Sequence, residues 1–72
     1  MSDPLLIRAA IDAAGGISSR QFAELILGRD QRTVRAWLAA ENVIPPKARE
    51  WLEHWVALPK RQRAVVMQIL AP

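Results

Sequence analysis

Residues 31–40 contain the side chains whose types and spacing best fit a binding chemistry. This segment holds one glutamine and two arginines and no acidic residue. If it is a helix that turns ~100° per residue, its apolar stripe is Val34, Trp37 and Leu38. The face that points away from this stripe is polar or small and consists of Gln31, Arg32, Arg35, Ala36 and Ala39. Arginine can bind guanine O6 and N7, glutamine can bind adenine N6 and N7, and an α-helix fits the major groove of B-DNA. The segment therefore predicts contact with base edges.

Five short helices are predicted to position this face. No stretch alternates apolar and polar residues as a strand does, and glycine and proline divide the chain at regular intervals. Asp3 is the expected N-cap of the first helix, Ser18 and Gln21 form a capping box at the second, and Asp30 caps the third. The predicted helices span residues 4–14, 18–27, 31–40, a segment beginning at Pro46, and a segment from about Pro59 to Leu70. The short connections predict an all-α compact bundle that forms one domain over residues 1–72.

Large apolar residues recur at helical spacing and predict one core. Its expected members are Phe22, Ile26, Val34, Trp37, Leu38, Trp51, Leu52 and Trp55. The tryptophans could instead form an aromatic stacking surface, but their positions match the apolar stripes, which favours the core. His54 has charged neighbours and is expected to be a surface residue rather than a ligand or a base.

Residues 18–46 have the order of a capped helix, a glycine turn, a second capped helix and a loop that ends in Pro-Pro. The residues that match a known pattern are Phe22, Ala23, Gly28, Val34, Trp37, Ile44 and Pro45. With them the segment resembles the helix-turn-helix of the lambda-repressor-like DNA-binding family, which includes Cro and the XRE-type phage repressors. The expected helix count also agrees. The family places its turn glycine four residues after the alanine, whereas Gly28 follows Ala23 by five, so the second helix or the turn holds one extra residue.

The resemblance implies a sequence-specific protein that binds double-stranded DNA and acts as a transcriptional repressor of the phage or mobile-element type, including regulators beside anti-CRISPR genes. It implies that Gln31, Arg32 and Ala36 read bases. Contacts with the DNA backbone are expected from Ser19, Arg20, Thr33, Arg35, Asn42 and Lys47. For Ser19 and Arg20, the positive end of the second helix supports this role, because it favours an anion.

The net charge is moderate, since ten Lys and Arg face seven Asp and Glu, giving +3. One copy should therefore bind DNA weakly, and a homodimer on an inverted-repeat operator is expected. The preferred dimer surface is the last helix, through Val66, Ile69 and Leu70. Cations crowd the first turn of that helix, where they oppose its dipole. Whether they contact phosphate, hold an acidic partner or only solvate the helix is left open for Lys60, Arg61 and Arg63.

Other classes of function are disfavoured by composition. The chain has no cysteine, no tyrosine and one histidine, so no thiolate zinc site or cysteine nucleophile is possible, and neither an enzyme nor a cofactor, metal or small-molecule ligand is expected. No apolar run approaches the ~20 residues of a membrane span and no basic signal region opens the chain, so a cytoplasmic protein without a membrane partner is expected. The alternative is a protein-interaction module or antitoxin-like adaptor. It would bind an acidic or apolar partner through the last helix or the tryptophan-bearing face of the fourth.

Overall fold

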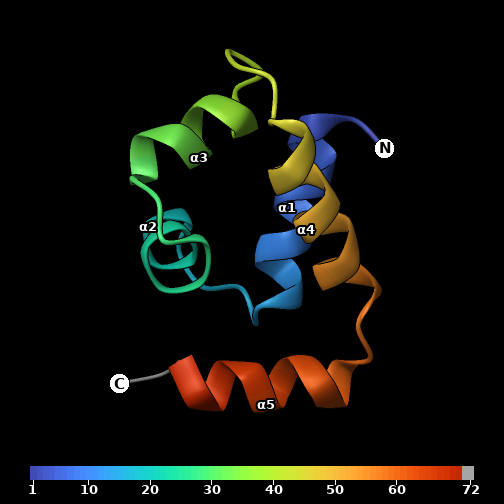
Figure 1. Ribbon diagram of the computed structural model, residues 1–72. Coiled ribbons are helices and arrows are strands. Elements are labelled where there is room, and N and C mark those ends of the chain that lie inside the picture. The colour runs from blue at the N-terminus through green and yellow to red at the C-terminus, as the bar shows by residue number, and fades with distance from the viewer. Residues whose placement is uncertain (71–72) are drawn as a thin grey trace.

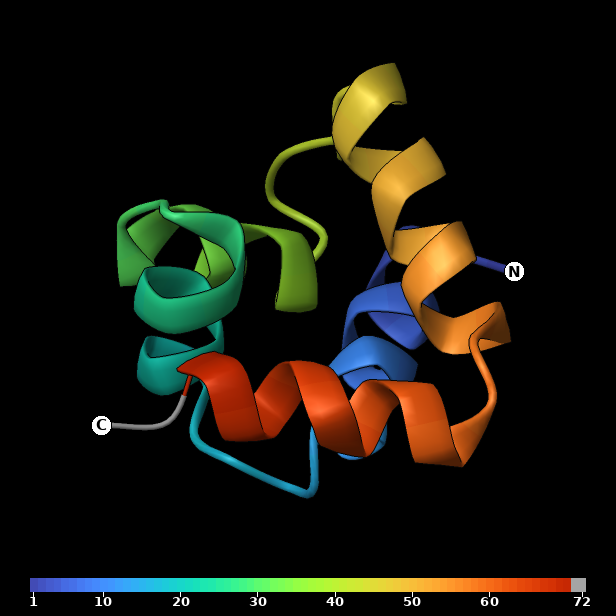
Figure 2. The ribbon, with the colours of Figure 1, turned by 60° about the horizontal axis from the view of Figure 1, so that its bottom comes forward.

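The computed structural model describes residues 1–70 as a bundle of helices (Figure 1). The helices are α1 (Asp3–Ala13), α2 (Ser19–Gln21), the π-helix η1 (Phe22–Leu27), α3 (Gln31–Leu38), α4 (Pro46–Ala57) and α5 (Lys60–Leu70). Helices α1 and α4 pack together, α3 packs on α1, and α2 and η1 both contact α3. Figure 2 shows α5 crossing one end of the bundle, from the end of α4 towards α2. The predicted all-α bundle is confirmed.

The core is the region where α1 meets the inner faces of η1, α3 and α4. Its buried members are Leu6, Ile7, Ala10, Ala14, Phe22, Ala23, Val34, Trp37, Ile44, Ala48, Leu52 and Trp55. The indole N–H of Trp55 donates to the carbonyl oxygen of Ala10 over 3.0 Å, so the polar atom of this ring is satisfied. Ile26 and Leu38, both predicted in the core, are half-buried against it.

The prediction that Trp51 belongs to the core is wrong, because 41% of this residue is exposed. Helix α4 points Leu52 and Trp55 at α1, which leaves Trp51 at the edge of the buried face. Its ring stacks on that of Trp55 with centroids 5.6 Å apart and planes 9° from parallel. Trp51 thus covers one side of a core residue and presents its other side to solvent.

The segment that leads to Gly28 is wound as the π-helix η1. The backbone N–H groups of Gly28 and Arg29 both donate to the carbonyl oxygen of Ala23, the second over 2.9 Å. The bond from Gly28 reaches back five residues and that from Arg29 reaches back six. A helical turn closed over five residues is wider than an α-helical turn. Gly28 then ends the helix at φ 63°, a left-handed conformation that glycine adopts readily. The wider helix and the left-handed Gly28 together leave three residues, 28–30, between η1 and α3.

The first helix begins one residue earlier than predicted, because Ser2 is its N-cap and Asp3 lies inside it. The Asp3 carboxylate is thereby released from capping and accepts the backbone N–H of Ile44 over 2.9 Å. It also forms an ion pair with Arg49 of α4. Asp3 consequently joins the start of α1, the loop after α3 and the first turns of α4.

Helix α5 is joined to the bundle by a cation. The guanidinium of Arg63 donates to the carbonyl oxygens of Leu58 and Val56, where α4 ends. These carbonyls have no partner inside α4, so Arg63 satisfies groups that would otherwise be orphaned. Arg63 thus has a structural role that is none of the three left open for the basic cluster, whereas Lys60 and Arg61 are exposed.

We predict that two tryptophan substitutions will differ in cost. Trp37 is 2% exposed, so Trp37→Ala should lower the free energy of unfolding by ~3–5 kcal/mol and unfold most of the protein. Trp51→Ala should cost only about 1 kcal/mol, because it removes mainly a stacking contact. Urea denaturation followed by circular dichroism measures both. Equal losses for the two variants would contradict the assigned burial.

We predict that the bundle tolerates a deletion inside η1. Removing Leu25 leaves the residues on both sides in register and lets the helix close as an α-helix, so the free energy of unfolding should change by less than about 1 kcal/mol. Removing Arg35 is the matched control, because it rotates Trp37 by ~100° out of the core. Thermal melts compare the variants. A Leu25 deletion as damaging as the Arg35 deletion would show that the wide helix is required for folding.

Candidate nucleic-acid interface

Burial of one face of α3 in the core determines which of its residues lie on the outward face. Val34 and Trp37 lie in the core, and the carboxylate of Asp30 caps the helix by accepting the N–H of Arg32 over 2.8 Å. Arg32 and Arg35 are consequently exposed on the side away from the core. The helix contains no acidic side chain, so the two arginines are the charged groups on this surface of Gln31–Leu38.

The three residues predicted to read bases share this helix but differ in exposure. Arg32 is exposed, whereas Gln31 and Ala36 are half-buried. The carbonyl oxygen of Ala36 accepts the backbone N–H groups of Glu41 over 2.9 Å and of Asn42 over 3.4 Å. The chain after α3 therefore folds back onto the helix end. Arg32 is the predicted base-reading residue with the greatest reach from the protein surface.

The first turn of α2 carries two of the predicted backbone contacts. Its capping box has formed: the Ser18 hydroxyl accepts the N–H of Gln21 over 3.1 Å, and the Gln21 side chain accepts the N–H of Ser18 over 3.2 Å. Ser19 is half-buried and takes no part in the cap. Arg20 pairs with Glu24 over 3.3 Å, but both side chains are mostly exposed. Such a pair is weak, so a phosphate can displace the glutamate.

The remaining predicted backbone contacts do not all lie together. Thr33 is half-buried in the first turn of α3, and Arg35 and Asn42 are exposed on that helix and on the loop after it. Lys47 lies instead in the first turn of α4, where it lines a hollow together with Arg29. Lys47 thus belongs to a different surface from the outward face of α3.

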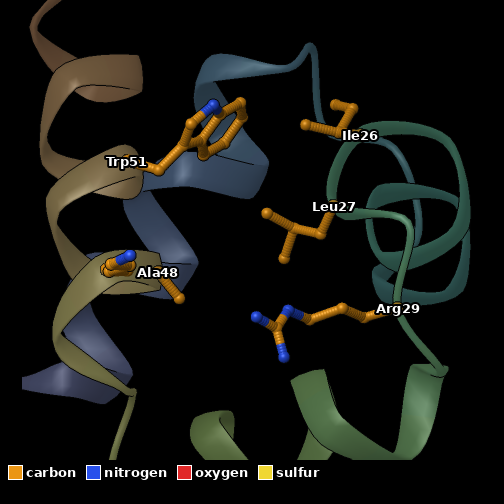
Figure 3. Close-up of a pocket in the computed structure, with 6 residues that line it drawn as sticks. Ile26, Leu27, Arg29, Ala48 and Trp51 are labelled. Carbon is orange, nitrogen blue, oxygen red and sulfur yellow. The ribbon is translucent and has the colours of Figure 1, made fainter.

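Sequence reasoning missed Arg29, which lies in the turn between η1 and α3. Its guanidinium sits over the Trp37 ring at 5.8 Å from the ring centroid. Figure 3 shows the side chain extending from the turn towards α4. The sequence feature that could have identified Arg29 is a cationic residue directly after the turn glycine and two residues before α3. Arg29 adds positive charge to the turn that precedes α3.

Across residues 1–70, no three acidic or histidine side chains come together as metal ligands. No helix of that range is long and apolar enough to cross a bilayer.

Comparison with known proteins gives no family for this arrangement: no family model, no curated protein and no solved structure matches the chain. A proposal about function therefore depends on the residues and geometry described above.

Proposed function

We propose that this protein binds double-stranded DNA sequence-specifically and inserts α3 into the major groove. The observation that supports this most strongly is the exposed, acid-free face of α3, with Arg32 and Arg35 on it and Val34 and Trp37 buried behind it. An ordinary solvated helix mixes acids with bases, and this helix does not. The face combines cations that attract the phosphate backbone with donors that can bind guanine.

The dimensions of α3 fit the proposed groove. An α-helix with its side chains is ~10–12 Å across, and a major groove ~12 Å wide admits it. Ala36 and Ala39 are small, so the helix can approach the base edges closely. Three residues, Gly28 to Asp30, separate η1 from α3, and α2 contacts α3. This arrangement supports a helix-turn-helix in which the first turn of α2 contacts the phosphate backbone.

The proposed biological role is that of a transcriptional repressor of the phage or mobile-element type. A protein that occupies an operator within a promoter excludes the polymerase without any catalytic step. The net charge of +3 is modest for a DNA-binding protein, which supports two copies on one operator. For the dimer surface, α5 offers Val65 and Ile69, which are 51% and 75% exposed, whereas Val66 packs towards the core.

We predict that replacing Arg32 and replacing Arg35 will weaken DNA binding in different ways. Arg32→Ala should cost ~1–3 kcal/mol on the preferred operator and relax the preference at one base pair, because it removes a bidentate contact to a base. Arg35→Ala should weaken operator and scrambled DNA by similar factors and lower the salt slope by about one unit, because a phosphate contact carries no sequence information. Fluorescence anisotropy at several salt concentrations measures both effects.

Arg8→Ala is the matched control for this pair, since it removes an exposed helical arginine from α1 that lies outside both α3 and the proposed dimer surface α5. The control should bind operator like the parent. If Arg32→Ala and Arg35→Ala remain folded and also bind like the parent, α3 is not the reading element.

We predict that DNA selected from a random pool at physiological salt is an inverted repeat. Its half-site centres should lie ~34–36 Å apart or a multiple of that distance, because two copies of α3 must face the same side of the duplex. Native mass spectrometry of the complex should find two chains per duplex. One chain on the best selected site would contradict the dimer.

A further inference from the structure

Trp51 lies at the centre of a groove that the DNA-binding proposal does not use. Three neighbouring hollows share this residue. One of about 230 Å³ lies between η1 and α4 (Figure 3), one of about 430 Å³ lies along α4, and one of about 250 Å³ reaches the loop before α5. We call this surface the Trp51 groove, and its principal lining residues are Ile26, Leu27, Lys47, Trp51, His54 and Leu58.

The lining of the groove is built to stay apolar and rigid. The Trp51 ring is backed by the parallel ring of Trp55, which is in the core, so it cannot fold inward. Ile26 and Leu27 point into the groove from the opposite side (Figure 3). Both come from η1, where the wider turn rotates less per residue and keeps neighbours on one face. Tryptophan is enriched among the residues that contribute most to protein–protein binding.

Two cations stand at one end of this groove. Arg29 and Lys47 line the first hollow from opposite sides, and neither has an acidic partner within the described range 1–70. Glu50, on the next turn of α4, is the one carboxylate among the lining residues of the three hollows. The groove therefore presents an apolar floor and an excess of positive charge at one end.

These properties select among the possible occupants. A small molecule is disfavoured because the hollows are open and shallow, whereas small-molecule sites enclose most of their ligand. Duplex DNA presents charged phosphates and does not match an apolar floor. A second copy of α5 contains no acidic residue, so it offers no carboxylate to Arg29 and Lys47. An amphipathic peptide with a carboxylate fits both the floor and the charge.

We propose that the Trp51 groove binds a short amphipathic segment of a partner protein, with large apolar side chains packed on Trp51 and a carboxylate between Arg29 and Lys47. The groove follows α4 from Lys47 to Leu58, which is ~16 Å of helix and enough for about three helical turns of a bound segment. The Trp51 groove lies on η1 and α4, whereas the proposed DNA-contacting side chains that project furthest from the protein lie on the outward face of α3. The inference is thus independent of DNA binding.

The test is a selection from a random dodecapeptide library displayed on phage, with the full chain as target. The recovered peptides are then synthesised and titrated by fluorescence anisotropy. They should share at least two large apolar residues and one acid. Their affinity should fall at least tenfold for Trp51→Ala and several-fold for the double variant Arg29→Gln, Lys47→Gln. Leu5→Ser, which removes an exposed apolar side chain of α1 outside the groove lining, is the matched control and should bind like the parent.

Circular dichroism verifies that each variant is folded, and Trp51→Phe, which keeps an apolar ring, should retain most of the affinity. Three outcomes would overturn the proposal: no enriched peptide, enriched peptides that bind Trp51→Ala as well as the parent, or enriched peptides that are basic. Protection of Trp51 from acrylamide quenching by duplex DNA but not by peptides would assign the groove to nucleic acid instead.

Discussion

The burial of Trp37 determines which face of α3 is exposed to solvent. This ring is 2% exposed and packs with Val34 into the core, where α3 contacts α1. A helix held by two such residues cannot rotate without opening a cavity. Arg32 and Arg35 therefore project outward as a consequence of packing. The guanidinium of Arg29 lies over the same ring, so the turn before α3 is packed against Trp37 of that helix.

The orientation of α3 depends in turn on contacts far apart in the sequence. Asp3 accepts the N–H of Ile44 and pairs with Arg49, which holds the loop after α3 between α1 and α4. At the other end, Arg63 satisfies the last carbonyls of α4 and brings α5 across the bundle. Each of these side chains satisfies backbone groups that a short helix or loop leaves unpaired. In a chain of 72 residues, a few such contacts add to what a small core supplies.

Local interactions made much of this predictable from the sequence. The caps at Ser18 and Asp30 depend on residues within three positions, and the buried pair in α3 follows from helical spacing. What was missed depends on tertiary contacts. In the sequence Asp3 resembles a helix N-cap, because its contacts with Ile44 and Arg49 form only in the folded chain. Arg63 likewise resembles a solvated surface charge, because the end of α4 comes near it only in the folded chain. Trp51 lies at the edge of an apolar stripe, where spacing alone cannot separate buried from exposed. The π-helical winding of η1 was not predicted either, because it depends on backbone hydrogen bonds that helical spacing does not reveal.

Insertion of α3 into the major groove is tested most directly by an NMR titration of the full chain with its selected duplex. Backbone amide shifts report which residues meet the DNA in solution. The largest changes should fall on residues 19–20 and 31–36, and the indole N–H of Trp51 and the amides of α5 should change little. Large changes at Trp51 or α5 with residues 31–36 unmoved would contradict the assignment of α3 as the DNA-reading helix.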